Sequence, residues 1–210
     1  MKRIDLFVAV NCVLFLLLCL LRYFARFVAY PGIGHIDEFF VYAVVILCCI
    51  VALWRVFQHH PFDASVLILL QVGIVMHFCG AFVLINGERL YDTMVLGVHY
   101  DKYVHFINSF TASLLFSHLF EIQRIPLTRV NSVFLLLVVL GLGAAVEIVE
   151  YVVTLTVPNN GVGGYDNNMQ DLIADFLGCL GFLVWRSVRA RSTARHPPSR
   201  AQTLPGLQAE

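Results

Sequence analysis

The stretch VFLLLVVLGLGAAVEIVEYVV, residues Val133 to Val153, decides the fold of this chain. It is long enough for a helix that crosses the hydrocarbon core of a bilayer, which is roughly 30 Å thick and requires about 20 mostly apolar residues. Two glutamates, Glu147 and Glu150, interrupt the last third of the apolar run. Because a charged group inside a membrane span is costly, it is retained mainly where it has a partner or a task. The stretch therefore predicts a transmembrane helix that carries part of a functional site.

The composition of the whole chain agrees with this stretch. Its 210 residues are 59% hydrophobic and 13% charged, and the mean hydropathy is +0.79. A water-soluble domain of this size is much less apolar and more charged, so the composition argues against a soluble fold. The formal net charge is zero, which gives no overall basic field that would favour a nucleic-acid partner.

Six apolar runs, separated by charges or by turn residues, predict the helices. An all-α, polytopic transmembrane bundle of about six helices fills residues 1–185, and a basic, disordered, cytoplasmic tail rich in Arg, Ser and Pro is expected over residues 186–210. The runs are Leu6 to Leu21, Phe39 to Val56, Val66 to Leu84, Val104 to Leu119, Val133 to Val153 and Leu172 to Trp185.

Neither a cleaved signal peptide nor a disulfide framework is predicted. The first apolar run follows Lys2 and Arg3 as a signal peptide would, yet arginines follow it in place of a small-residue cleavage site, so we expect an uncleaved first helix. The six cysteines lie inside apolar runs rather than in loops with metal-type spacing, which indicates packing residues.

The distribution of Lys and Arg predicts the orientation in the membrane. With six spans both termini lie on one face, which carries ten of the basic residues, whereas the opposite face carries four. The positive-inside rule therefore predicts that both termini are cytoplasmic.

Three pairs of ionisable residues are expected at one membrane depth. The fourth predicted helix enters, the fifth leaves and the sixth re-enters at one face, which is extracytoplasmic in this orientation. The pairs open the fourth helix, lie late in the fifth and open the sixth: Asp101 and His105, Glu147 and Glu150, and Asp171 and Asp175.

The spacing within each pair is i,i+3 or i,i+4, so both members project from one side of their helix. Several carboxylates held close together in a low dielectric repel each other, so the cluster is expected either to hold protons or to enclose a cation. Carboxylate oxygens with one imidazole suit Mg, Mn, Ca or Zn. The six residues are therefore predicted metal ligands, and Glu147, Glu150 and Asp171 are the predicted catalytic residues.

Structural roles for the same residues remain open. The carboxylates can pair with Lys102 or Arg89, and an acidic residue near a helix N-terminus is favoured by the helix dipole. His77 is expected to be a packed, hydrogen-bonded histidine. Small residues in the last two helices, Gly141, Gly143, Gly178 and Gly181, predict close contact between those helices. Weaker candidates, for the cavity entrance or an outer contribution, are His35, Asp37, Glu38 and Asp166.

Three motifs carry a resemblance to a known family. The segments YDKYVHF (residues 100–106), EIVE (147–150) and YDNNMQDLIADFLG (165–178) resemble the YjdF-like inner-membrane protein family and are distantly similar to VanZ-like proteins. The latter share an Asp-Lys-x-x-His-Phe opening, a glutamate in the next helix and a later aspartate. That resemblance extends to Asp101, His105, Glu147 and Asp171, whereas Glu150 and Asp175 stand where VanZ-like proteins more often carry amides.

The resemblance implies a multi-pass protein of the bacterial inner membrane and assigns no activity. Our leading hypothesis is that the cluster binds a divalent cation and acts on a lipid-linked or cell-envelope substrate by Lewis-acid chemistry. A small proton- or ion-coupled transporter and a non-catalytic membrane scaffold are the alternatives. An open cavity at the cluster would favour the enzyme or the carrier, and dry packing with every carboxylate paired would favour the scaffold.

Overall fold

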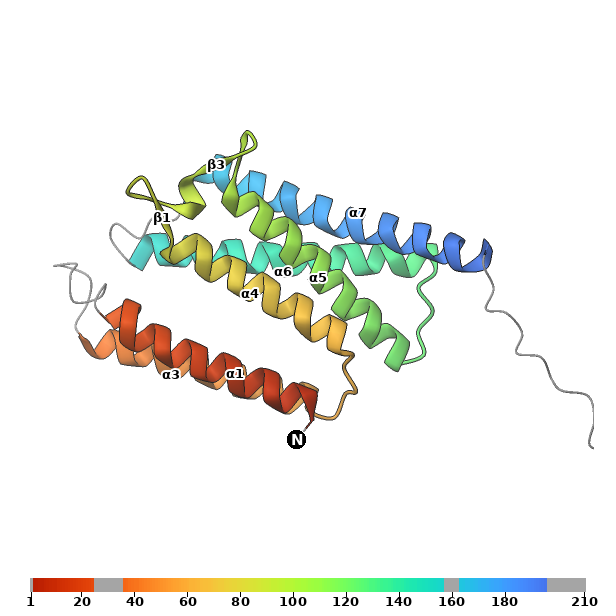
Figure 1. The fold of residues 1–210 in the computed structure, drawn as a ribbon, viewed down its shortest axis with the longest axis horizontal. Coiled ribbons are helices and arrows are strands. Elements are labelled where there is room, and N and C mark those ends of the chain that lie inside the picture. The colour runs from red at the N-terminus through yellow and green to blue at the C-terminus, as the bar shows by residue number, and fades with distance from the viewer. Residues whose placement is uncertain (1, 25–35, 157–162, 196–210) are drawn as a thin grey trace, which may run out of the picture.

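The computed structural model describes residues 2–24, 36–156 and 163–195, in which six long helices form a bundle (Figure 1). This confirms the predicted all-α membrane fold. The helices are α1 (Arg3–Leu18), α3 (Ile36–Phe57), α4 (Ala64–Phe82), α5 (Tyr100–Ile122), α6 (Arg129–Thr156) and α7 (Tyr165–Arg195).

Helices α1 and α3 lie side by side along one edge of the bundle (Figure 1). Helix α1 continues into a π-helical turn, η1 (Cys19–Tyr23). Phe15 near the end of α1 and Cys19 at the start of η1 pack against Ala43 and Leu47 of α3. Helix α4 contacts both α1 and α5 and so joins this edge to the rest of the bundle.

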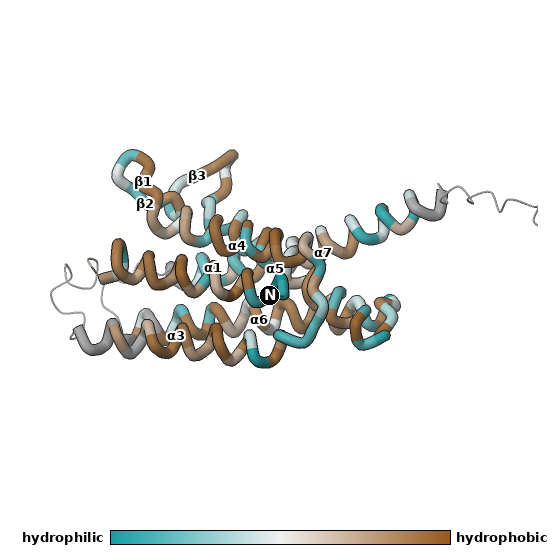
Figure 2. The backbone as a smooth tube through the Cα atoms, turned by 60° about the horizontal axis from the view of Figure 1, so that its bottom comes forward, coloured by the Kyte–Doolittle hydropathy of each residue, from teal (hydrophilic) through white to brown (hydrophobic). Residues whose placement is uncertain are grey.

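Three of the described helical segments are long and apolar enough to cross a membrane by themselves: Arg3–Tyr23, Ala64–Phe82 and Arg129–Val152. Figure 2 shows hydrophobic residues along most of α1 and α3, and the shorter apolar segment Ala43–Phe57 belongs to α3. Helices α5 and α7 fall outside this group because they carry the polar residues of the bundle. These two polar helices make the most extensive helix–helix contact in the described chain.

The contact between α5 and α7 is close because a glycine removes the side chain that would separate them. A Cβ atom on Gly178 would collide with the backbone carbonyl of Phe106 in α5, and Gly181 lies against the Phe106 ring. The sequence had suggested that these glycines face α6. Gly178 and Gly181 instead lie against α5, and of the two α6 glycines Gly143 is the one that approaches α7, at the side chain of Asp175.

Two small β-hairpins connect α4 to α5, where the sequence predicts only turn residues. Strands β1 (Leu84–Ile85) and β2 (Glu88–Arg89) form the first, and β3 (Met94–Val95) and β4 (Val98–His99) form the second. The 3-10 turn η2 (Leu90–Asp92) lies between them. Both reversals use a residue pair with positive φ that ends in glycine, Asn86-Gly87 and Leu96-Gly97, as two-residue hairpins require.

Helix α7 extends past the expected boundary at Trp185 and continues to Arg195. Arginine and alanine are strong helix formers, so the basic segment continues the helix where a disordered tail was expected. The remainder of that tail, residues 196–210, lies outside the described residues. All six cysteines carry free thiols, and Cys179 is fully buried between α5, α6 and α7.

Candidate functional site

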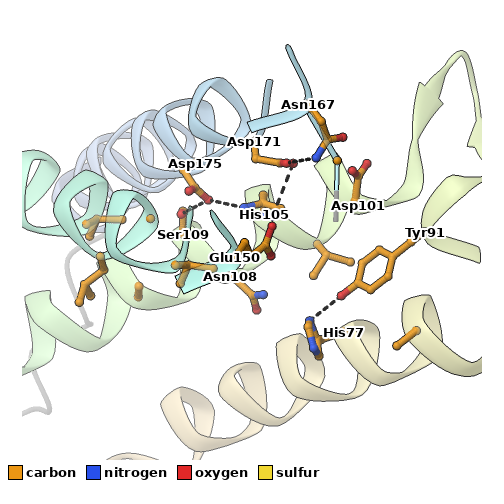
Figure 3. Close-up of a pocket in the computed structure, with 18 of the residues that line it drawn as sticks. His77, Tyr91, Asp101, His105, Asn108, Ser109, Glu150, Asn167, Asp171 and Asp175 are labelled. Carbon is orange, nitrogen blue, oxygen red and sulfur yellow. Dashed lines mark hydrogen bonds and ion pairs between the residues drawn. The ribbon is translucent and has the colours of Figure 1, made fainter. Parts of the chain in front are cut away.

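A cavity of about 410 Å³ lies between α4, α5, α6 and α7 at the end of the bundle that carries the hairpins (Figure 3). It is lined on one side by Ala112, Val139, Leu142 and Val146, which are apolar. The predicted residues that line it are Asp101, His105, Glu150, Asp171 and Asp175. Three helices therefore direct ionisable side chains into one space, as the shared membrane depth indicated.

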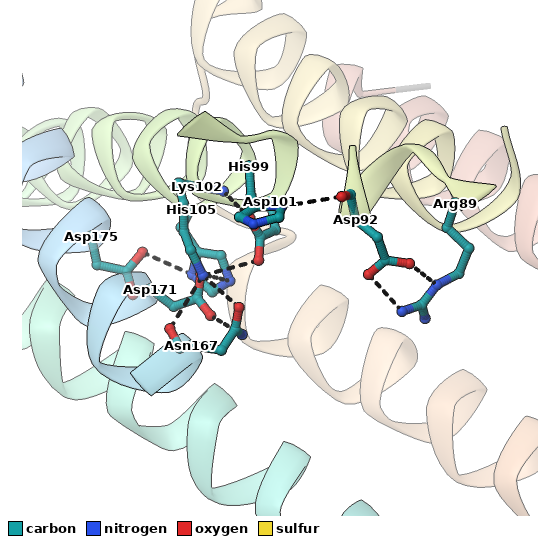
Figure 4. A network of polar contacts seen from close by, with 9 residues as sticks. All are labelled: Arg89, Asp92, His99, Asp101, Lys102, His105, Asn167, Asp171 and Asp175. Atoms are coloured by element: carbon teal, nitrogen blue, oxygen red, sulfur yellow. Dashed lines mark hydrogen bonds and ion pairs between the residues drawn. The ribbon is translucent and has the colours of Figure 1, made fainter. Parts of the chain in front are cut away.

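A buried lysine organises one wall of this cluster (Figure 4). The ammonium group of Lys102 lies 2.8 Å from Oδ1 of Asp171 and 3.0 Å from Oδ2 of Asp101. It also donates to the backbone and side-chain oxygens of Asn167, at 3.2 and 2.7 Å. Lys102 thus supplies a positive charge that offsets part of the carboxylate repulsion, in agreement with the structural role that the sequence left open for Asp101 and Asp171.

His105 lies between the two aspartates of α7. Its Nε2 is 3.5 Å from Oδ1 of Asp171, and its Nδ1 is 3.3 Å from Oδ1 of Asp175. Ser109, one turn further along α5, donates to the same Asp175 oxygen at 2.7 Å. These contacts fix the plane of the imidazole and keep both ring nitrogens within reach of a carboxylate.

Glu147 differs from the buried aspartates Asp171 and Asp175 because its carboxylate makes no hydrogen bond in the described residues. The residue is only 7% exposed, and neither carboxylate oxygen has a hydrogen-bond partner in the described residues. Oδ2 of Asp175 is also buried without a partner. A buried carboxylate is unfavourable unless a charge or a hydrogen bond compensates it, so these oxygens require a proton or a cation.

One imidazole nitrogen and two carboxylate oxygens, from His105, Glu147 and Asp171, lie within 4.8 Å of one another. Two ligands on opposite sides of a cation at bond lengths of about 2.0 to 2.6 Å are roughly 4 to 5 Å apart, so a single ion could contact all three. Asn167 donates to Oδ2 of Asp171 at 2.7 Å and holds that carboxylate in place. Such outer hydrogen bonds commonly orient metal ligands.

The other three predicted ligands lie outside this group. Asp101 accepts hydrogen bonds from the backbone and ammonium nitrogens of Lys102, which makes it a partner of the lysine. Asp175 holds the far side of His105. Glu150 lines the cavity one helical turn beyond Glu147. Of the six predicted ligands, three therefore lie close enough to share one ion, and the other three are their neighbours.

The wall of the cavity that faces this cluster carries a second polar pair. The Tyr91 hydroxyl, on η2, forms a short hydrogen bond with Nδ1 of His77 on α4 (Figure 3). The Tyr91 ring lies directly against Gly80, where a Cβ atom would collide with it. Burial raises the pKa of the Tyr91 phenol, so the hydroxyl keeps its proton for this bond. His77 is hydrogen-bonded, as expected, and it also lines the cavity.

Sequence reasoning missed the central position of Lys102 and the contributions of Asn167 and Ser109. Lys102 stands next to Asp101 in the YDKYVHF motif, and Asn167 precedes Asp171 by one helical turn, so the spacing that selected the acids also contained these partners. Asp166 is exposed and its neighbour Asn167 takes the inner position. His35 and the side chains of Asp37 and Glu38 lie outside the described residues.

The comparisons with known proteins concern the same part of the chain. No curated protein and no solved structure matches it, and the distant VanZ-like similarity is not found. A family model described as a predicted membrane protein, DUF2238, matches residues 8–192, a range that holds all the residues of the cavity. Since the match covers most of the bundle, the chain belongs to this YjdF-like family of predicted membrane proteins.

Proposed function

We propose that this membrane protein binds a divalent cation between α5, α6 and α7, at His105, Glu147 and Asp171. The buried carboxylate of Glu147, which lacks a hydrogen-bond partner among the described residues, carries the proposal. Lys102 cannot compensate it, because the lysine already contacts Asp101, Asp171 and Asn167. A cation between the three ligand atoms would compensate Glu147 and Asp171 together.

The coordination sites left open would determine the chemistry. Three protein ligands leave further positions of the ion free for water or substrate, which is the arrangement of catalytic rather than structural metal sites. A bound cation would polarise a phosphate oxygen or activate a water molecule. The cavity has room for a polar group and supports a lipid-linked or cell-envelope substrate that presents such a group from the membrane.

The distribution of charges supports a location in the bacterial inner membrane with the cavity on the extracytoplasmic side. The cavity lies where α4 and α6 end and α5 and α7 begin. The opposite end of the bundle carries most of the arginines, including Arg129 and Arg186. By the positive-inside rule that end, together with both termini, faces the cytoplasm.

A proton-coupled carrier is the second candidate, because Glu147 could be compensated by a proton as well as by a cation. The cavity beside the cluster supports this candidate and the metal site equally. The network of Lys102, Asp101 and Asn167 supports a scaffold role for that wall alone. An experiment must therefore determine whether a cation or a proton compensates the Glu147 carboxylate.

The test is the metal content of the full-length protein, purified in mild detergent and dialysed against Mg, Mn, Ca or Zn. We expect about one equivalent of one cation in the wild-type protein and at least a tenfold weaker affinity after Glu147→Gln. The amide keeps the shape of the side chain but not its charge. Complementation of a deletion strain by the same variants connects binding to function.

Glu121→Gln is the matched control. Glu121 is an acidic residue at the other end of α5, and its side chain is 64% exposed. Its replacement should leave the metal content unchanged. Wild-type protein without a bound cation in any of these conditions would contradict the metal site. If Glu147→Gln at the same time abolished complementation, the proton carrier would replace it.

A further inference from the structure

A second hollow, of about 480 Å³, lies between the beginning of α6 and the end of α7, at the opposite end of the bundle from the cavity. Leu127 and Leu183 give it an apolar floor, and Arg129 and Arg186 contribute the charged groups. No carboxylate is among its lining residues. The hollow therefore combines apolar surface with two positive charges from two different helices.

These two arginines have no counter-ion in the part of the chain that the structure describes. Neither Arg129 nor Arg186 forms an ion pair or a side-chain hydrogen bond with a described residue. The two serine hydroxyls that line the hollow already donate within the chain: Ser132 donates to Thr128 O and Ser187 donates to Leu183 O, both at 2.8 Å. The guanidinium groups remain available for an external anion.

The hollow lies at the boundary of the membrane rather than in water. Arg129 is the first residue of the apolar span Arg129–Val152. Trp185 stands beside Arg186 on α7 and stacks under the guanidinium of Arg189 at 5.4 Å. Tryptophan and snorkelling arginine are typical of the headgroup region, where a phosphate is surrounded by water on one side and acyl chains on the other.

We infer that this hollow binds the phosphate of an anionic phospholipid, with Arg129 and Arg186 contacting the headgroup and Leu127 and Leu183 contacting the acyl chains. Basic pockets between transmembrane helices at the headgroup level bind such lipids through charge and through hydrogen bonds from the guanidinium fork. The inference concerns a different end of the bundle and is independent of the proposed cation site.

Quenching of Trp185 fluorescence by bromine-labelled lipid tests the site. The full-length protein contains two tryptophans, so Trp54→Phe leaves Trp185 as the reporter. The protein is reconstituted into phosphatidylcholine vesicles with increasing fractions of brominated phosphatidylglycerol. We expect saturable quenching at low fractions, and a half-saturation point that rises about fivefold for each arginine replaced, in Arg129→Gln and in Arg129→Gln/Arg186→Gln.

Two controls separate a built site from general attraction. Arg191→Gln removes the same charge from the exposed end of α7 outside the hollow, and it should leave the half-saturation point unchanged. Native mass spectrometry of the wild-type protein, with both tryptophans present, should find retained phosphatidylglycerol that the double variant loses. Melting temperatures and circular dichroism check that each variant is folded.

Three results would overturn the inference. Brominated phosphatidylcholine could quench Trp185 as strongly as brominated phosphatidylglycerol, which would show no selection for the anionic headgroup. Arg191→Gln could weaken quenching as much as Arg129→Gln, which would mean diffuse attraction to the basic end of the helix. Glycerol phosphate in solution could abolish the quenching, which would identify a soluble phosphate as the ligand in place of a lipid.

Discussion

Lys102 and Asp171 meet in the interior of the bundle, with Nζ 2.8 Å from Oδ1, although 69 positions separate them in the sequence. Lys102 is 7% exposed and Asp171 is 1% exposed. The pair ties the beginning of α5 to the first turns of α7. It also fixes the orientation of Asp171, one of the three groups within reach of a common cation.

Replacing the lysine should therefore be strongly destabilising. We expect Lys102→Met to reduce the free energy of unfolding by about 3 to 5 kcal/mol, because it leaves buried carboxylates without their counter-ion. Thermal unfolding in detergent, followed by circular dichroism, measures the loss. The control is Asp92→Asn, which breaks the exposed pair between Arg89 and Asp92 and should cost about 1 kcal/mol or less. Equal effects of the two variants would show that burial of the Lys102 pair is not what matters.

Gly178 should tolerate no large side chain. Gly178→Leu places a branched side chain against the α5 backbone at Phe106 and is expected to cost more than about 1 kcal/mol of stability. Gly141→Leu is the matched control, since nothing lies within 4 Å of a Cβ atom built on Gly141. Membrane-inserted yield and detergent melting temperature should fall for Gly178→Leu only. A normal melting temperature would mean that α5 and α7 can separate without loss.

Gly143→Ala should change the site rather than the fold. The added methyl group would collide with Oδ2 of Asp175, which holds the far side of His105. Displacement of such an outer partner commonly weakens metal binding by about tenfold or more. Titration of both variants with the cation that binds the wild-type protein in the metal analysis proposed above measures this change. Gly141→Ala is the control, because its methyl group would meet open space and should leave the cation affinity unchanged. Equal cation affinities in the two variants would show that Asp175 does not support the site.

Tyr91 predicts a dependence of stability on alkaline pH. Because the pKa of Tyr91 is raised in the folded protein, its contribution to stability is fully present below the unfolded value of about 10 and declines as the pH rises above it. The melting temperature of the wild-type protein should therefore fall more steeply above pH 10 than that of Tyr91→Phe. Parallel curves for the two proteins would show that the phenol is not held protonated by the fold.

The orientation can be tested with reporter fusions. Fusions after residue 159 and after residue 200 should report from opposite sides of the membrane, with residue 200 in the cytoplasm, because the terminal face carries ten of the fourteen Lys and Arg residues. Activity of an extracytoplasmic reporter at residue 200 would place the cavity in the cytoplasm. In that case an envelope substrate would be ruled out.

Membrane depth could be predicted from the sequence because it depends only on where each helix begins and ends. The position of Glu147 late in its run, and of Asp101 and Asp171 at the beginning of theirs, was sufficient to bring α5, α6 and α7 together at one site. The rotation of each helix about its axis is set by its neighbours instead. For this reason the sequence alone does not show that Gly178 faces α5, or that Asp101 contacts Lys102.

The hairpins were missed for a different reason. Each strand contains two residues, too few for an alternating pattern to emerge, and only the Asn86-Gly87 pair is a common signal for a tight reversal. From the sequence, Lys102 is one charge that can pair with an acid. Its burial, and its contact with two aspartates and Asn167, depend on the packing of α7 against α5 and cannot be read from local spacing.

The partnership of Lys102 with Asp171 also constrains how the protein is made. Helices α1, α4 and α6 contain segments that are long and apolar enough to cross a bilayer by themselves, whereas α5 brings a buried lysine that has one partner, Asp101, beside it and a second, Asp171, 69 residues later. The full set of contacts of Lys102 therefore forms only when α7 packs against α5, so the order of synthesis makes the site one of the last parts of the bundle to be completed.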